Sequence, residues 1–171
     1  MNCQPIHRND LPQLIQYFDS LSEKTRSFYG PHPFDEPTLR ALCDGSYESF
    51  KAFVVTEQTS IIGYTVIKQG YSEGELYRYP NYDIIMDSTN HFLYAPSISD
   101  AHQSKGIGSI MLAYIENYLQ PQAATHLVLW GGVQARNQRA IRYYEKNGFF
   151  KLGEFHYDGL DNWDMVKPLI N

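Results

Sequence analysis

Hydrophobic and polar residues follow two different periods along the chain, and these periods predict its helices and strands. Apolar side chains recur every three or four residues in four stretches, so we expect helices at residues 11–21, 35–43, 107–119 and 138–147. Short apolar runs bounded by turn residues predict strands instead, at residues 2–7, 50–56, 61–68, 91–98, 126–130, 149–157 and 163–167. The chain therefore begins with a meander of strands and continues with strands that alternate with helices.

This order of elements predicts an α/β fold in which helices cover both faces of a mixed sheet. The run at 126–130 is apolar on both faces, as is typical of a central strand. Residues 70–90 have no clear period and contain many of the 14 tyrosines. We expect an insertion there, or a connection that extends the preceding hairpin or forms a functional loop. Without an internal repeat or a linker, the chain is expected to form one domain, residues 1–171.

Composition removes several classes of function. A net charge of −5 argues against non-specific nucleic-acid binding, which needs a basic face. No apolar run approaches membrane-spanning length, and residues 1–10 are polar and lack the apolar stretch that a signal peptide carries. Cys3 and Cys43 have no metal-ligand spacing, and the six histidines are scattered, so we expect free thiols and no metal. The sequence predicts a cytoplasmic protein without a nucleic-acid or membrane partner.

A glycine-rich loop separates the strand at 91–98 from the helix at 107–119. A helix N-terminus presents unpaired N–H groups and the positive end of the helix dipole. Glycines allow the backbone to approach a bulky anion, so the loop is a candidate phosphate site. A glycine-rich turn without a ligand would have the same pattern. The loop lacks the Gly-Lys-Ser/Thr ending of a P-loop and the third glycine of a dinucleotide site. Its sequence is Gln103-Ser104-Lys105-Gly106-Ile107-Gly108-Ser109.

Two motifs resemble the GCN5-related N-acetyltransferases, the GNAT superfamily. The order Gln-x-x-Gly-x-Gly after a strand resembles the acetyl-CoA pyrophosphate loop of that family. Asn137 opens a second motif, which runs through Tyr143-Tyr144-Glu145-Lys146 to Gly148-Phe149 and is similar to the other GNAT signature. The motifs occur in the family's order with a strand between them. The resemblance covers residues 50–155 and is closest from Ile98 onward.

The resemblance implies a single-domain GNAT fold with a mixed, mostly antiparallel sheet that splays between its two central strands. It implies acetyl-CoA as co-substrate, with pantetheine against the backbone of Ile98 and the pyrophosphate on the N–H groups of residues 104–109. Gln103 would lie at the mouth of the loop, and Asn137 would reach the pantetheine arm. Tyr144 would face the thioester sulfur and protonate the leaving thiolate, unless it is simply a core tyrosine.

The sequence departs from the family just before the loop. Many members carry a proline and an aromatic residue there, whereas this chain has Asp100, Ala101 and His102, with Pro96 further upstream. The shape of the strand end and the backbone contact at Ile98 are therefore open.

The general base is not identified by the sequence. Acetyl transfer needs a neutral amine, and family members often use a glutamate on the strand before the loop or a chain of waters. Residues 91–98 contain no carboxylate. The alternatives are His91, Tyr94, Glu75 and Asp83, and the plainer interpretation of each is a solvated surface residue.

The family places the acceptor site at segments corresponding to residues 28–34 and 71–94. The latter is rich in tyrosine and in acids, which outnumber Arg78. Acidic and aromatic groups suit an ammonium ion, such as a lysine side chain, a peptide N-terminus or an amino sugar. Alternatively, the tyrosines pack an additional sheet or a contact between two copies, which would make a homodimer. The acids are Glu73, Glu75, Asp83 and Asp87.

We therefore expect an acetyl-CoA-dependent N-acetyltransferase that transfers acetyl directly to a primary amine of a small molecule, peptide or protein. The alternative from another class is a non-catalytic acyl-CoA-binding module that senses or recruits. A third hypothesis is an enzyme that transfers a longer acyl group.

Overall fold

The computed structural model describes residues 1–47 and 50–169. They fold into two compact units: the first contains residues 1–67 and 95–115, and the second contains residues 68–94 and the chain from 116 onward. The boundaries fall inside strands β3 (Ser60–Gln69) and β4 (His91–Ile98) and helix α5 (Ile107–Leu119), so these elements contribute to both units. That residues 1–171 form one domain stays a prediction.

The strands of the first unit follow the order β1-β2-β3-β4. Strands β1 (Asn2–Pro5) and β2 (Lys51–Glu57) pair antiparallel, and so do β2 and β3. At the end of β4, the Ser99 N–H donates to the Ile62 carbonyl at 3.0 Å. The hairpin that the sequence predicts is therefore present and lies beside β4.

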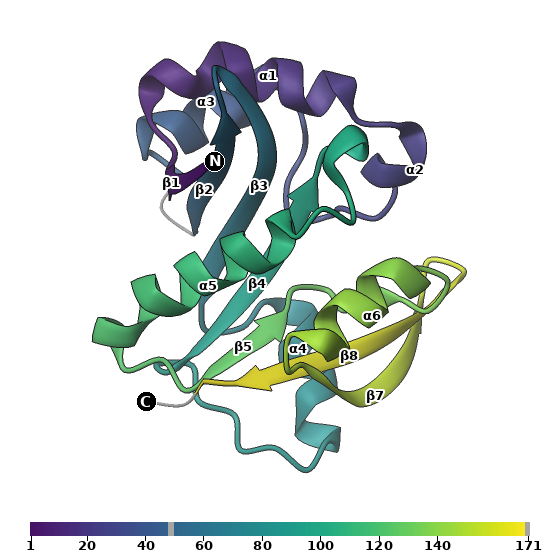
Figure 1. Ribbon diagram of the computed structural model, residues 1–171. Helices are drawn as coiled ribbons and strands as arrows, with labels where there is room; N and C mark the ends of the chain where they lie inside the picture. Colours follow the sequence, from purple (N-terminus) through teal and green to yellow (C-terminus); the bar gives the residue numbers. More distant parts are fainter. Residues whose placement is uncertain (48–49, 170–171) are drawn as a thin grey trace. The chain divides into compact units, whose positions relative to one another are not determined.

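Three helices of the first unit precede β2: α1 (Leu11–Ser20), α2 (Glu23–Arg26) and α3 (Glu36–Asp44), with α1 and α3 lying side by side in Figure 1. Helix α3 begins where Asp35 accepts the Thr38 N–H at 2.9 Å, and it ends at Gly45, whose φ is 72°. These local signals explain why the sequence predicts α3 well. Helix α2 has four residues, too few to show a period, and the sequence analysis does not anticipate it.

The last residues of β4 lie between two helical layers of the first unit. Tyr17 of α1 donates its hydroxyl to Ser97 at 2.9 Å. The next residue, Ile98, packs against the buried side chains of Ile107 and Met111 on α5. Successive strand residues point to opposite faces, so α1 and the first turns of α5 cover opposite faces of the sheet here.

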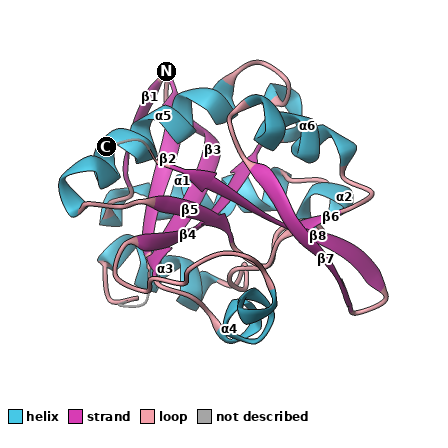
Figure 2. Cartoon of the chain, turned by 90° about the horizontal axis from the view of Figure 1, so that it is seen from below, coloured by secondary structure: helices cyan, strands magenta, loops and turns pink. Residues whose placement is uncertain are grey.

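The second unit continues the sheet in the order β4-β5-β8-β6, with β7 also paired to β8. Strand β5 (His126–Leu129) is parallel to β4. Strands β6 (Val133–Gln134), β7 (Phe150–Tyr157) and β5 are all antiparallel to β8 (Leu160–Pro168). These strands are drawn in magenta in Figure 2. The predicted mixed, mostly antiparallel sheet is confirmed. The parallel pairing ends at Tyr94 and Leu129, where β5 also ends and β4 continues to Ile98. The splay between the central strands stays a prediction.

Residues 70–90 are more ordered than their sequence pattern predicts. They contain helix α4 (Glu73–Arg78) and a 3-10 turn, η2 (Tyr79–Asn81). Glu75 reaches back to the Ser72 N–H at 3.2 Å, which is a capping interaction at the start of α4. Tyr71 and Tyr79 are buried in a cluster with Leu93, Val128 and Val166, so part of the tyrosine content packs the core of this unit.

Candidate active site

The loop between β4 and α5 adopts an unusual backbone conformation. A short 3-10 turn, η3 (Asp100–His102), follows β4, and then φ is positive at Ser104 (61°) and Gly106 (83°). The Gly106 carbonyl accepts the N–H groups of Ser109 (3.0 Å) and Ile110 (3.2 Å), which begins the helix. A Cβ placed on Gly106 would meet nothing within 4 Å. The loop thus exposes its backbone on an open side.

The amides just before the helix are available as donors. Over residues 1–47 and 50–169, the N–H groups of Lys105, Gly106 and Ile107 make no hydrogen bond. Lys105 and Gly106 are exposed. Consecutive N–H groups at a helix start, with the positive end of the dipole behind them, form a place where an anion can bind.

The end of β4 offers one more donor. The Ser99 N–H is taken by β3, and the N–H groups of neighbouring strand residues point to opposite sides, so the Ile98 N–H points away from β3. It has no acceptor in the described part of the chain. Gly63 on β3 matters here, because a Cβ there would lie 3.1 Å from Ile98 Cδ1 and 3.4 Å from Ile107 Cγ2. The missing side chain allows strand and helix to pack closely behind the loop.

Gln103 supports the loop from inside the fold. Its Nε2 donates to the Ile98 carbonyl at 3.1 Å and to Thr25 Oγ1 at 3.3 Å. Both N–H bonds of the side-chain amide are therefore used within the protein. The side chain that the sequence places at the mouth of the loop is better suited to hold the loop than to contact a phosphate.

Helix α6 (Gln138–Lys146) carries the second pair of candidate residues, in the second unit. Asn137 caps it, and Oδ1 accepts the Ala140 N–H at 3.2 Å. Tyr144 lies two turns along, is buried, and has its ring edge-on to Phe149 at 5.2 Å. Burial raises the pKa of the Tyr144 phenol, so it stays protonated at neutral pH. Its hydroxyl makes no hydrogen bond to any described residue.

The preceding residue, Tyr143, has a different environment. Its hydroxyl lies 3.3 Å from the Tyr94 hydroxyl of β4, and burial raises its pKa to about 12. The Tyr143 phenol is therefore engaged with the sheet, while the Tyr144 phenol is not engaged with a described side chain.

Residues 15–149 match the model of the acetyltransferase (GNAT) family. This span is most of the chain and includes both motifs. The chain belongs to the GNAT family of acetyltransferases. The family match confirms the resemblance on which the sequence analysis relied, and it makes this a protein of an acyltransferase family.

Solved structures of GNAT proteins share the fold. The GNAT domain of PAT from S. lividans superposes with a TM-score of 0.76 at 15% identity, covering 98% of this chain and 89% of that one. The ribosomal-protein-alanine N-acetyltransferase from Brucella melitensis gives 0.74 at 18%, covering 99% and 100%. AAC(6')-Ib in complex with paromomycin and acetyl-CoA gives 0.71 at 19%, covering 98% and 92%. The α/β GNAT fold is thereby confirmed.

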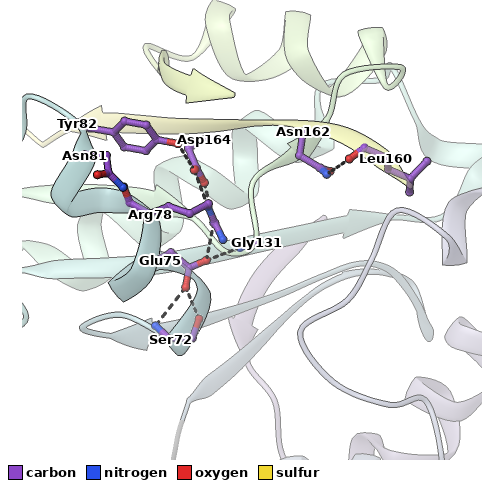
Figure 3. Close-up of polar contacts among 9 residues, drawn as sticks. All are labelled: Ser72, Glu75, Arg78, Asn81, Tyr82, Gly131, Leu160, Asn162 and Asp164. Atoms are coloured by element: carbon purple, nitrogen blue, oxygen red, sulfur yellow. Dashed lines mark hydrogen bonds and ion pairs between the residues drawn. The ribbon is translucent and has the colours of Figure 1, made fainter. Parts of the chain in front are cut away.

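Glu75, one of the alternative bases, belongs to a buried polar network of the second unit. It is 1% exposed and accepts the N–H groups of Gly131 (2.7 Å) and Ser72 (3.2 Å) as well as the Ser72 hydroxyl (Figure 3). The Arg78 guanidinium lies 3.6 Å from the same carboxylate. Glu75 therefore fixes α4 and the turn after β5 and is not an open carboxylate that could take a proton from an amine.

Arg78 joins Glu75 to a second buried carboxylate. It donates to both oxygens of Asp164, at 2.7 and 2.8 Å, and Tyr82 donates to the same carboxylate at 2.7 Å (Figure 3). Asp164 is fully buried, and a buried charge needs such partners. The Arg78 guanidinium also lies 3.8 Å from the Phe155 ring centroid. The sequence analysis misses this network, although a charged residue between the apolar side chains of the last strand was a visible signal.

The other three candidates for the general base lie in environments unlike that of Glu75; they are His91, Tyr94 and Asp83. His91 is buried, its Nδ1 shares a hydrogen bond with the Tyr71 hydroxyl, and its ring lies beside His126 with centroids 4.5 Å apart. Burial and then His126 lower the pKa of His91 to about 4, so it is neutral at pH 7. Tyr94 is buried, and Asp83 is exposed.

The described residues contain no cluster of three His, Cys, Asp or Glu side chains able to hold a metal ion, and no helix among them could span a membrane.

Proposed function

We propose that the protein is an acetyl-CoA-dependent N-acetyltransferase that transfers acetyl directly from the thioester to a primary amine. The observation that carries this proposal is the pairing of two donor sets in the first unit. The Lys105, Gly106 and Ile107 amides are positioned for a diphosphate, and the Ile98 N–H at the end of β4 is directed away from β3. Membership of the GNAT acetyltransferase family supports acetyl-CoA as the co-substrate.

In this proposal the cofactor is held mainly by the backbone. Within the loop 104–109, the N–H groups of Lys105, Gly106 and Ile107 bind the pyrophosphate, and the exposed Lys105 side chain adds a positive charge. Asn137 and the backbone of Ile98 contact the pantetheine arm, with Gln103 supporting the loop. The chain's net charge of −5 makes this local positive potential more important, because the overall field does not attract an anion.

The reaction proceeds without a covalent enzyme intermediate. The amine nitrogen attacks the thioester carbonyl carbon and forms the C–N bond, while the oxyanion accepts a backbone N–H, an interaction worth about 2.7–4 kcal/mol in comparable sites. The C–S bond then breaks and Tyr144 protonates the thiolate. The nitrogen loses its extra proton to solvent, and the Tyr144 phenolate takes up a proton from solvent. An alkyl ammonium must first be deprotonated, at a cost of about 4–5 kcal/mol at pH 7.

For the acceptor we propose a cationic amine. With Glu75 sequestered, the acids that remain exposed between residues 71 and 94 are Glu73 and Asp83. Glu73 lies one helical turn from Tyr77, which is 84% exposed, so both side chains share a face of α4. A carboxylate and an aromatic ring on one face suit an ammonium ion by charge and by cation–π contact.

The runner-up is an acyl-CoA-binding module without catalysis. It is favoured by the absence of a carboxylate on β4 (His91–Ile98) and by the burial of Glu75, which leave no obvious base. Against it stands Tyr144, whose hydroxyl is not used within the described structure.

One assay separates these proposals. We expect thiol release from acetyl-CoA to accelerate when the protein is given amines from a panel of amino sugars, lysine peptides and peptide N-termini. Binding of coenzyme A in calorimetry without turnover of any amine would support the non-catalytic module, and absence of binding would contradict both. Faster release from longer acyl-CoAs than from acetyl-CoA would favour the longer-chain enzyme.

A further inference from the structure

Asp100, at the position where the sequence departs from the family pattern, is bonded to a distant helix start. It is the first residue of η3, and its carboxylate accepts three hydrogen bonds from Ser22, the N-cap of α2, and from Thr25 within that helix. The Ser22 N–H donates to Oδ2 at 2.8 Å, the Ser22 hydroxyl to Oδ1 at 2.9 Å, and the Thr25 hydroxyl to Oδ1 at 2.6 Å. All of these groups belong to the first unit.

The other end of the same turn returns to the same helix. Gln103 follows η3 and donates to Thr25 Oγ1, as well as to the Ile98 carbonyl. The Thr25 hydroxyl thus accepts from Gln103 and donates to Asp100, and it is buried. Hydrogen bonds linked in one direction and ending on a carboxylate strengthen one another.

We propose that Asp100, Gln103, Ser22 and Thr25 form a tether between the loop 103–109 and the start of α2 at residues 22–25. Through this tether the loop and the start of α2 become ordered together. Asp100 is a positioning residue in this scheme, because it acts through the loop. The inference rests on the proposed function, in which that loop binds the diphosphate of acetyl-CoA.

The tether preorganises the loop. Three amides can converge on one anion only while the backbone stays near its positive φ values at Ser104 and Gly106. Anchors at Asp100 and Gln103, just before these residues, restrict the loop before any ligand arrives, and this restriction improves affinity by lowering the ordering cost.

The tether also connects the loop to residues that follow α2. The Phe28 N–H donates to the Thr25 carbonyl at 3.2 Å and the Tyr29 N–H to the Arg26 carbonyl at 3.1 Å, so the segment at 28–34 extends directly from the anchored turn. A ligand that steadies the loop must then steady this segment, and the reverse must hold by linkage. The proposed consequence is that acetyl-CoA prepares the 28–34 segment for the acceptor.

Asp100 restricts the loop backbone and also bonds to the start of α2, and a proline at position 100 separates these two effects. Ser99 has φ −55° and ψ 142°, which suits a residue before proline, and Asp100 is the first residue of a helical turn, where proline is tolerated. Asp100→Pro therefore keeps the backbone restricted but removes the bonds to α2, whereas Asp100→Ala removes both. Asp35→Ala is the matched control, because it removes carboxylate bonds to the Thr38 N–H and hydroxyl at the start of α3.

The test is hydrogen–deuterium exchange with and without saturating coenzyme A. The dissociation constant of coenzyme A is measured for each variant as well. In the wild-type protein we expect coenzyme A to protect residues 103–109 and also 22–29. Asp100→Ala should raise the dissociation constant about tenfold, as expected for lost bonds to a charged group, and protection should be confined to 103–109. Asp100→Pro should bind within about threefold of wild type with the same confinement, and Asp35→Ala should behave as wild type.

Equal protection of residues 22–29 in Asp100→Ala and wild type would overturn the tether. The tether would also be overturned if Asp35→Ala raised the dissociation constant of coenzyme A as much as Asp100→Ala does. If the wild-type loop at 103–109 gained no protection while coenzyme A bound elsewhere or not at all, the proposed function itself would fail, and the tether's role in it would fail too.

Discussion

At the scale of single residues, environment decides the roles that residue type leaves open. Tyr143 and Tyr144 are adjacent and chemically identical, yet the Tyr143 hydroxyl faces Tyr94 and the Tyr144 hydroxyl has no described partner. Glu75 illustrates the opposite outcome, since a carboxylate considered as a base is held by Gly131 and Ser72. A motif can point to a residue, but only its surroundings show whether its polar atoms are available.

Tyr144→Phe tests the proposed general acid. The substitution keeps the ring against Phe149 and removes the hydroxyl, so we expect the rate of acetyl transfer to fall by about 10²–10⁴ with little change in stability. Tyr143→Phe is the matched control and should retain most activity. The role would be refuted if steady-state rates showed Tyr144→Phe at wild-type activity, or Tyr143→Phe as the more damaged variant.

His91 gives the protein a defined acid sensitivity. Its pKa is about 4 in the fold, against an ordinary value of 6.5, because it is buried beside His126; the Tyr71 hydroxyl and Asp87 also face it. As pH falls from 6.5 towards 4, the unfolded chain takes up a proton that the folded protein does not. Stability is therefore lost across this window, at up to about 1.4 kcal/mol per pH unit.

Urea unfolding of His91→Asn between pH 4 and 7 measures this contribution. Asparagine can still form a hydrogen bond with the Tyr71 hydroxyl but does not titrate, so we expect a shallower fall in stability with decreasing pH. Parallel slopes for His91→Asn and wild type would show that another group causes the acid sensitivity.

At the scale of elements, those with local signals could be predicted and those without could not. Strand β4 has the predicted bounds, and Asn137 caps α6 as expected, because period, cap and stop lie within a few neighbouring residues. Helices α2 and α4 are too short to show a period. Helix α4 is stabilised instead by Asp164, which is 86 positions from Arg78, and no local pattern could reveal that pairing.

The loop before α5 depends on glycine at position 106. Gly106→Ala places a Cβ in a left-handed conformation, which costs about 1–2 kcal/mol of unfolding free energy. Gly159→Ala is a close match, since Gly159 has φ 73° and also open space around its Cβ, but it lies in the β7–β8 turn. We expect similar destabilisation in both variants and a loss of coenzyme A affinity of about tenfold or more only in Gly106→Ala. Calorimetry showing equal affinities would separate Gly106 from ligand binding.

At the scale of the whole molecule, the GNAT fold and family were accessible from sequence because two motifs occur in the right order with a strand between them. The candidate site was accessible in part. The backbone donors follow from glycine spacing and the strand–loop–helix order. The inward side chain of Gln103 and the bonds from Asp100 to Ser22 depend on contacts that sequence periodicity does not encode.

The central claim is that the Lys105, Gly106 and Ile107 amides bind the diphosphate of coenzyme A. Its most direct test is a titration of ¹⁵N-labelled protein with coenzyme A and, separately, with pantetheine, which has the same thiol arm but no diphosphate. We predict that coenzyme A shifts the backbone resonances of these three residues strongly and that pantetheine does not. The claim would be contradicted if coenzyme A left them unmoved, or if pantetheine shifted them equally.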